Sequence, residues 1–129
     1  MSNEGIMICA APGTRWPLTI DDFATNLRSR WPNVRTWLKH SLRTNDDYLD
    51  FDVPFPDYTR SGAYFNGTMF TLGDDTPEFW GSTVEWFLSL LPQDAQIVGI
   101  MEAASEMATI PRNSTATRIV AILDELNSR

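Results

Sequence analysis

Four closely spaced aspartates form the densest group of potential metal ligands in the sequence. They are Asp46, Asp47, Asp50 and Asp52. Oxygen ligands of this kind suit a hard cation such as Ca²⁺ or Mg²⁺, but the segment lacks the glycine turn and distal Glu of an EF-hand loop. The simpler interpretation is the solvated face of a half-buried strand. We therefore expect no metal and no other cofactor.

The chain has one cysteine, Cys9, and one histidine, His40, which together could supply a nucleophile and a base. Cys9 lies in an apolar run, where a thiol usually packs as a small inert side chain. The sequence has no G-x-S-x-G, P-loop or G-x-G-x-x-G motif. We expect no catalytic residues and lean toward a protein that is not an enzyme, with an unfamiliar active site as the open alternative.

Charge is unevenly distributed along the chain, which carries a net charge of −7. Residues 23–43 contain five bases and no acid, whereas residues 44–111 contain twelve acids and one base. The basic stretch also contains Trp31 and Trp37, a combination found in single-stranded nucleic-acid grooves. The overall acidity argues against phosphate binding. We expect an acidic face that attracts a basic protein, the alternative being an ordinary acidic surface.

The element that must position much of the fold is a helix within residues 76–92, TPEFWGSTVEWFLSLLP. Thr76 can cap it, Pro77 suits its first position and Pro92 ends it. One apolar stripe on this helix comprises Trp80, Val84, Phe87, Leu88 and Leu91.

Apolar residues also lie off that stripe, at Phe79, Trp86 and Leu90. A second apolar face has two explanations. The loop that carries Phe55 and Tyr58 can fold over it, or an aromatic side chain can anchor a partner protein. The sequence leaves both open.

Other segments show strand patterns or helix patterns. The expected strands are residues 5–11, 48–53, 95–101 and 105–110, with 33–43 ambiguous but favoured as a strand. Residues 54–62 are expected as a loop, and residues 63–72 as either a hairpin about Asn66-Gly67 or one strand with a bulge at Gly67. Two further helices are expected, one capped by Thr19 and one after the capping segment 111–115.

This order predicts a single α+β domain over residues 1–129. We expect an antiparallel sheet of four to six strands with helices packed mainly on one face, of ferredoxin-like kin, plus a C-terminal helix. No apolar run approaches the ~20 residues of a membrane span. The N-terminus lacks a basic segment followed by a long apolar one, so we expect a cytoplasmic protein and no membrane partner.

Three blocks together carry a resemblance: Thr76-Pro77-Glu78, then Trp86-Phe87-x-x-Leu90-x-Pro92, then the strand at residues 97–101. This layout resembles small actinobacterial α+β proteins, some of which are similar to immunity proteins that neutralise polymorphic toxins. The resemblance implies an acidic, single-domain inhibitor of the bacterial cytoplasm that binds one protein partner. It brings no catalytic residues, and the basic stretch in residues 28–43 departs from some relatives.

The sequence therefore favours a non-enzymatic protein-binding domain, an immunity-type inhibitor of a basic partner. The residues expected to bind that partner are Asp46, Asp47, Asp50, Asp52, Asp74, Asp75, Phe79 and Trp86. One alternative is a small-molecule-binding protein or hydrolase with a pocket between sheet and helices. The other is a structural homodimer that uses the central helix or a sheet edge.

Overall fold

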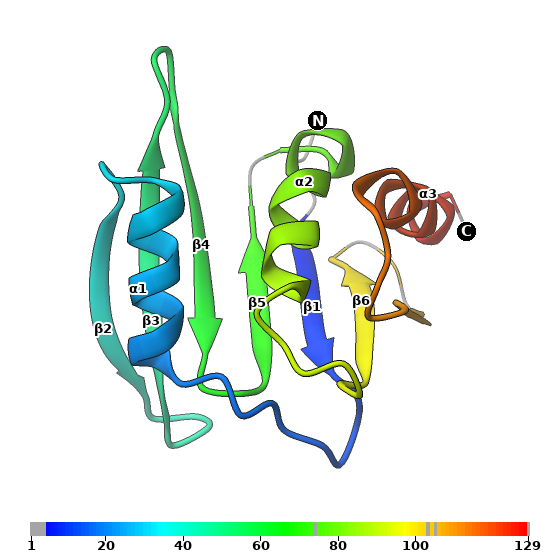
Figure 1. The fold of residues 1–129 in the computed structure, drawn as a ribbon, viewed down its shortest axis with the longest axis horizontal. Coiled ribbons are helices and arrows are strands. Elements are labelled where there is room, and N and C mark those ends of the chain that lie inside the picture. The colour runs from blue at the N-terminus through cyan, green and yellow to red at the C-terminus, as the bar shows by residue number, and fades with distance from the viewer. Residues whose placement is uncertain (1–4, 74, 103, 105, 129) are drawn as a thin grey trace.

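A computed structural model describes residues 5–73, 75–102, 104 and 106–128. Within them the chain forms one open antiparallel sheet of seven strands and three helices. Figure 1 shows the helices in front of the sheet, on one of its two faces. The α+β class and the packing of helices on one face are confirmed.

The elements follow one another in a simple order. The strands are β1 (Ile6–Ala10), β2 (Arg35–Ser41), β3 (Asp46–Pro54), β4 (Thr59–Phe65), β5 (Met69–Leu72), β6 (Ile97–Met101) and β7 (Met107–Thr109). The helices are α1 (Ile20–Arg30), α2 (Pro77–Leu88) and α3 (Ala116–Asn127). In space the strands are ordered β2-β3-β4-β5-β1-β6-β7, and each neighbouring pair is antiparallel.

The expected number of four to six strands was too low. Residues 63–72 form parts of two strands, because Gly67 adopts a φ of 75° and the chain reverses at Asn66-Gly67. The expected loop at 54–62 was too long. Phe55 N donates a hydrogen bond of 2.7 Å to Tyr58 O, and this tight turn lets β4 begin at Thr59.

The ambiguous residues 33–43 contain β2, so the preference for a strand is confirmed. The kinship with ferredoxin-like folds is limited to one unit. β5, α2 and β6 form a split β-α-β unit, with β1 between its two strands. By contrast, α1 links β1 to β2 across three intervening strands.

Each helix begins at a threonine whose side chain accepts a backbone hydrogen bond. Thr19 accepts from Asp22 N, Thr76 from Phe79 N and Thr115 from Arg118 N. These bonds satisfy amide groups that a helix leaves without an internal partner. The expected helix starts are therefore confirmed.

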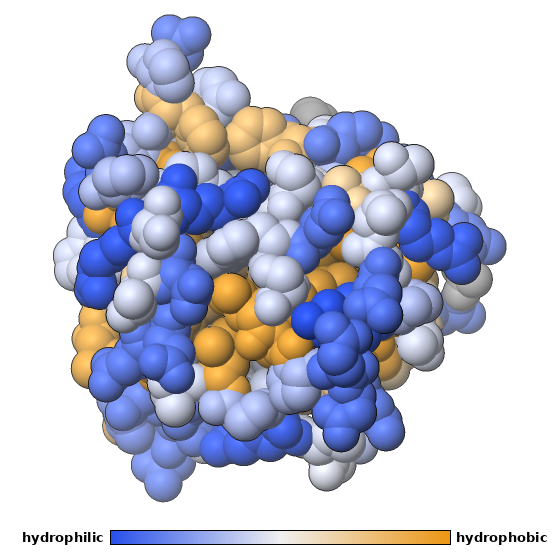
Figure 2. Space-filling view, in the orientation of Figure 1, coloured by the Kyte–Doolittle hydropathy of each residue, from blue (hydrophilic) through white to orange (hydrophobic). Residues whose placement is uncertain are grey.

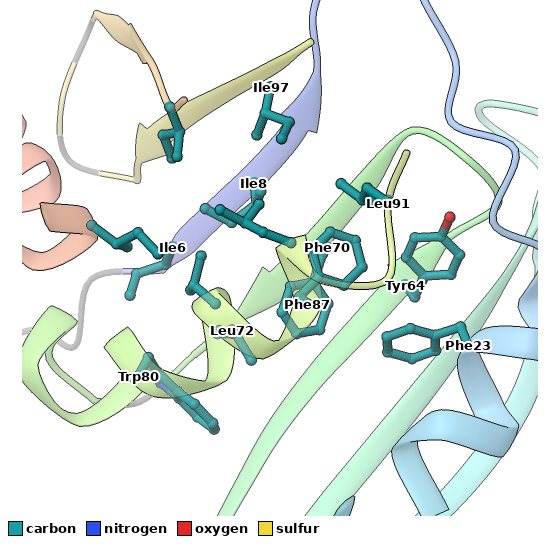
Figure 3. Close-up of a cluster of buried hydrophobic side chains, with 14 of the residues drawn as sticks. Ile6, Ile8, Phe23, Tyr64, Phe70, Leu72, Trp80, Phe87, Leu91 and Ile97 are labelled. Carbon is teal, nitrogen blue, oxygen red and sulfur yellow. The ribbon is translucent and has the colours of Figure 1, made fainter. Parts of the chain in front are cut away.

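The core lies between the sheet and the helices and is built largely from aromatic rings (Figure 3). Phe70 of β5 stacks on Phe87 of α2 with ring centroids 4.3 Å apart. Phe23 of α1 stacks on Tyr64 of β4 at 4.6 Å. These buried rings pack between the sheet and the helices α1 and α2.

The helix side of the molecule is mostly hydrophilic, with apolar surface gathered between α1 and α2 (Figure 2). Partly buried side chains such as Ile20, Trp86 and Leu90 pack against the core. Among the described residues, none of the helices combines the length and apolarity that crossing a bilayer requires.

Candidate binding surface on the helix-free face

Strand register identifies the side chains that share the face of the sheet opposite the helices. Directly opposite residues in neighbouring strands point to the same face. Tyr48, Phe65, Met69, Cys9 and Val98 are successive opposite partners from β3 to β6. We call these five residues the apolar row. Its Tyr48 and Phe65 rings stack with centroids 4.7 Å apart.

A second line of side chains runs parallel to the apolar row. Ala63, Thr71, Met7, Ile100 and Met107 are again opposite partners, this time from β4 to β7. Met107, at the sheet edge, is 50% exposed. Ala63 and Val98 are buried, whereas the other members of the two lines are partly exposed. The exposed part of the helix-free face along these lines is therefore mainly apolar.

This surface is unusual for an antiparallel sheet with one open face, whose strands normally alternate between apolar and polar residues. β3 follows the rule, since Leu49, Phe51 and Val53 are buried and Asp50 and Asp52 lie on the other face. β1 and β6 read IMICA and IVGIM and are apolar on both faces. No helix of the described chain covers the second face of either strand, so this apolar face is a candidate binding surface.

Two of the expected partner-binding aspartates lie at the flank of this face, next to β2. Lys39 Nζ lies 2.7 Å from Asp50 Oδ2, and Arg35 Nη2 lies 3.7 Å from Asp52 Oδ2. Ser61 donates a hydrogen bond of 2.7 Å to Asp52. The hydrogen bond to Asp50 raises the pKa of Lys39. Folding thus pairs the two bases of β2 with Asp50 and Asp52 of β3.

The other two aspartates of this cluster also meet positively charged or titratable partners. Arg15 Nη2 lies 3.1 Å from Asp46 Oδ2. His40 Nδ1 lies 2.9 Å from Asp47 Oδ1 and His40 Nε2 lies 3.2 Å from Asn45 Oδ1. The bond to Asp47, followed by that to Asn45, raises the pKa of His40. Each of the four aspartates thus contacts a basic or titratable side chain, so the cluster is not a free acidic surface.

The remaining predicted acids lie elsewhere in the fold. Asp75 accepts a hydrogen bond of 2.9 Å from Arg60 Nε, just before the N-terminus of α2. Asp74 lies outside the described residues. No group of three or more His, Cys, Asp or Glu side chains suited to a metal occurs in the part of the chain that the structure describes.

The two predicted aromatic anchors, Phe79 and Trp86, lie on α2 and thus on the helix side. The ring centroid of Phe79 lies 5.4 Å from that of Phe55 and 6.1 Å from that of Tyr58. Trp86 has its centroid 6.1 Å from that of Trp31. The loop thus folds over this second face of the helix. The sheet separates both anchors from the helix-free face, so the structure does not combine them with Asp50 and Asp52.

Cys9 and His40 do not form a nucleophile–base pair. They lie on β1 and β2, four strand spacings apart at about 4.8 Å each. Burial raises the pKa of the Cys9 thiol, which disfavours the reactive thiolate. Cys9 belongs instead to the apolar row.

A shallow depression of about 400 Å³ lies where the side chains of the helix-free face are small. Met7, Ser61 and Thr71 contribute to its lining, and the carboxylates of Asp50 and Glu102 lie at its margins. Glu102 Oε1 also accepts a hydrogen bond from Gly5 N at 3.0 Å. The lining of the depression is mainly apolar, with a few hydroxyl and carboxylate side chains among its residues.

Comparisons with protein-family models, with curated proteins and with solved structures found no match to this chain. The sequence prediction placed the partner-binding residues on β3 and α2 and missed the apolar row. The available signal was the absence of alternation in IMICA and IVGIM, which is typical of strands covered on both faces. The row itself depends on strand order, which links residues as distant in sequence as Cys9 and Val98.

Proposed function

We propose that this chain is a non-enzymatic protein-binding domain, an immunity-type inhibitor that binds one basic partner protein on its helix-free sheet face. The observation that carries the proposal is the apolar row, which crosses four strand pairings on a face without helices. Apolar surface of this extent is a feature of protein interfaces. The resemblance to immunity-type proteins supports the class of function.

The charge of the molecule supports a basic partner. The net charge of −7 gives the chain a negative field that speeds the capture of a positively charged protein. Close to the face, Asp50 and Asp52 remain about one-third exposed although they are paired. A partner's Lys or Arg can share these carboxylates with Lys39 and Arg35.

A photocrosslinking side chain at the apolar row tests this proposal. Benzoylphenylalanine replaces Phe65 on the helix-free face, and in a matched control replaces the exposed Arg28 on α1. After irradiation in a native lysate, we expect one basic protein to be crosslinked at Phe65 and not at Arg28. Equal adducts at both positions, or an acidic product, would contradict the proposal.

The crosslinked protein is then purified and titrated against a face variant. Met69→Glu places a charge in the centre of the apolar row, where truncation or charge at an interface core typically costs 2 kcal/mol or more, roughly thirtyfold in Kd. Because Met69 is outside the core, the free energy of unfolding should change by less than about 1 kcal/mol. Unchanged affinity would place the partner on another surface.

A small, largely apolar molecule is the second candidate ligand, favoured by the depression beside Met7. The volume of this depression lies within the range of known ligand sites, and the depression is shallow. In the same lysate experiment, a small ligand leaves no protein adduct at Phe65. Thr71→Trp fills the depression and would then abolish ligand binding while leaving the apolar row unchanged.

A further inference from the structure

The two most exposed large apolar side chains of the described chain lie at one edge of the sheet, together with an exposed tryptophan. Leu42 is 92% exposed, Leu38 is 66% exposed and Trp37 is 46% exposed. The last two lie on β2, the outermost strand, and Leu42 begins the turn that follows it. Side chains of this kind favour strand pairing, and leaving them in water makes a sheet edge prone to association.

β2 also lacks the features with which proteins usually protect an edge strand. The opposite edge strand, β7, has only three residues. β2 has seven residues, without proline or glycine, and β3 is its one strand neighbour in the described structure. Charged residues can protect an edge, but Arg35 and Lys39 are directed to Asp52 and Asp50 of their own sheet.

We infer that β2 pairs antiparallel with β2 of a second copy of this chain, with Leu38 at the two-fold axis. In this register Leu38 lies opposite Leu38, Trp37 opposite Lys39 and Arg35 opposite Ser41. The flat Trp37 ring is thereby placed beside the partner's ammonium group, a favourable cation–π arrangement. The exposed Leu38 side chains cover one another.

The neighbouring symmetric registers are less favourable. Centring the axis on Trp37 sets Arg35 opposite Lys39 twice, and centring it on Lys39 sets two lysines directly opposite. Like charges in direct opposition destabilise strand pairs. Of these three registers, only the one centred on Leu38 places apolar side chains opposite one another without also placing two basic residues opposite one another. In this register the strand is complementary to itself.

Pairing of this kind is independent of the proposed function. The two strands join in the plane of the sheet, so seven strands from each copy form one continuous sheet. A two-fold axis perpendicular to the sheet places both helix-free faces on the same side. The apolar row of each copy stays open, and the dimer presents two binding faces to partners.

Sedimentation equilibrium from micromolar to millimolar concentration tests the dimer. The wild-type chain should dimerise reversibly, and Leu38→Lys should weaken dimerisation about tenfold or more, because it sets lysines in opposition. Met107→Lys is the matched control, since it changes an exposed apolar residue on the other edge strand. A monomer at millimolar concentration, or a dimer that Leu38→Lys leaves intact, would overturn the inference.

Cysteine crosslinking tests the register in the full chain with Cys9→Ser. Leu38→Cys places two thiols opposite one another at the axis, within reach of a disulfide. Thr36→Cys, on the same face of β2, instead lies opposite His40. We expect rapid covalent dimerisation of Leu38→Cys on mild oxidation and at least about tenfold slower dimerisation of Thr36→Cys. Equal rates would exclude this register.

Discussion

Charged residues that are separated along the sequence become neighbours in the fold. The bases of residues 23–43 and the acids that follow them appear as two blocks along the chain. Folding makes β2 and β3 neighbours, so Lys39 meets Asp50 and Arg35 meets Asp52. The sequence suggested an acidic strand face, and it could not show that bases of the adjacent strand pair with Asp50 and Asp52.

The hydroxyl of Tyr64 gives a prediction about stability. This buried group donates a hydrogen bond of 2.8 Å to Leu18 O and accepts one of 3.1 Å from Gly67 N. Tyr64→Phe leaves both backbone groups without this partner, so the free energy of unfolding in urea should fall by about 1–3 kcal/mol. Tyr58→Phe, at an exposed tyrosine, is the control and should change it by less than about 0.5 kcal/mol. Equal effects of the two changes would show that the Tyr64 bonds contribute little.

The pH dependence of stability should include a contribution from His40. Its bond to Asp47 raises its pKa in the folded chain, so the folded state binds the proton more tightly than the unfolded state. This stabilisation is complete below the unfolded pKa of about 6.5 and is lost as pH rises through the folded value. Thermal melts should therefore show a larger gap between wild type and His40→Gln at about pH 6 than at about pH 9. A gap that is constant or grows with pH would contradict the assigned pair.

At the scale of elements, β1 shows what a periodicity argument can and cannot predict. The apolar run predicted a buried strand correctly, but it did not reveal that one of its faces lies outside the core. Ile8 is fully buried beneath the helices, whereas Met7 lies half-buried on the helix-free face. We expect Ile8→Ala to lower the free energy of unfolding by about 2–5 kcal/mol and Met7→Ala by less than about 1 kcal/mol. Similar losses, measured by urea unfolding, would mean that both faces belong to the core.

The contact between α2 and α3 depends on the absence of a side chain at Gly81. A Cβ at this position would lie 2.7 Å from Val120 Cγ2 and 3.4 Å from the Ala116 carbonyl oxygen. Gly81→Ala should therefore destabilise the chain by about 1–3 kcal/mol, despite the better helix propensity of alanine. With Val120→Ala present, the added methyl group has room. The double-mutant cycle should then show a favourable coupling of about 1 kcal/mol, and strict additivity would refute the proposed clash.

At the scale of the whole molecule, the class of fold followed from local patterns, whereas the arrangement of strands did not. Caps such as Thr19 and Thr76 and the Asn66-Gly67 turn act over a few residues, and each was readable from the sequence. The order of the sheet depends on which distant strands pack best under α1 and α2. The apolar row and the β2 edge exist only through that order, so the candidate surfaces were the least predictable part of the protein.

The capture of a basic partner should respond to the charge of the whole molecule rather than to one cluster. Asp57, in the turn between β3 and β4, and Asp94, in the turn before β6, are exposed and lie outside the β3 cluster, whereas Asp50 and Asp52 flank the helix-free face. Converting either pair to Asn removes the same charge. At about 0.01 M salt, where screening extends over roughly 30 Å, both variants should slow association several-fold and to a similar degree.

The dissociation rate should separate the two pairs, because only Asp50 and Asp52 lie beside the proposed interface. Stopped-flow measurements with the crosslinked and purified partner should show faster dissociation for the Asp50→Asn, Asp52→Asn variant and little change for the Asp57→Asn, Asp94→Asn variant. Raising the salt above about 0.1 M should remove the association effect and leave the dissociation effect largely in place. If the association rate changes neither with these substitutions nor with salt concentration, electrostatic steering is ruled out. The apolar row would then be the main source of affinity.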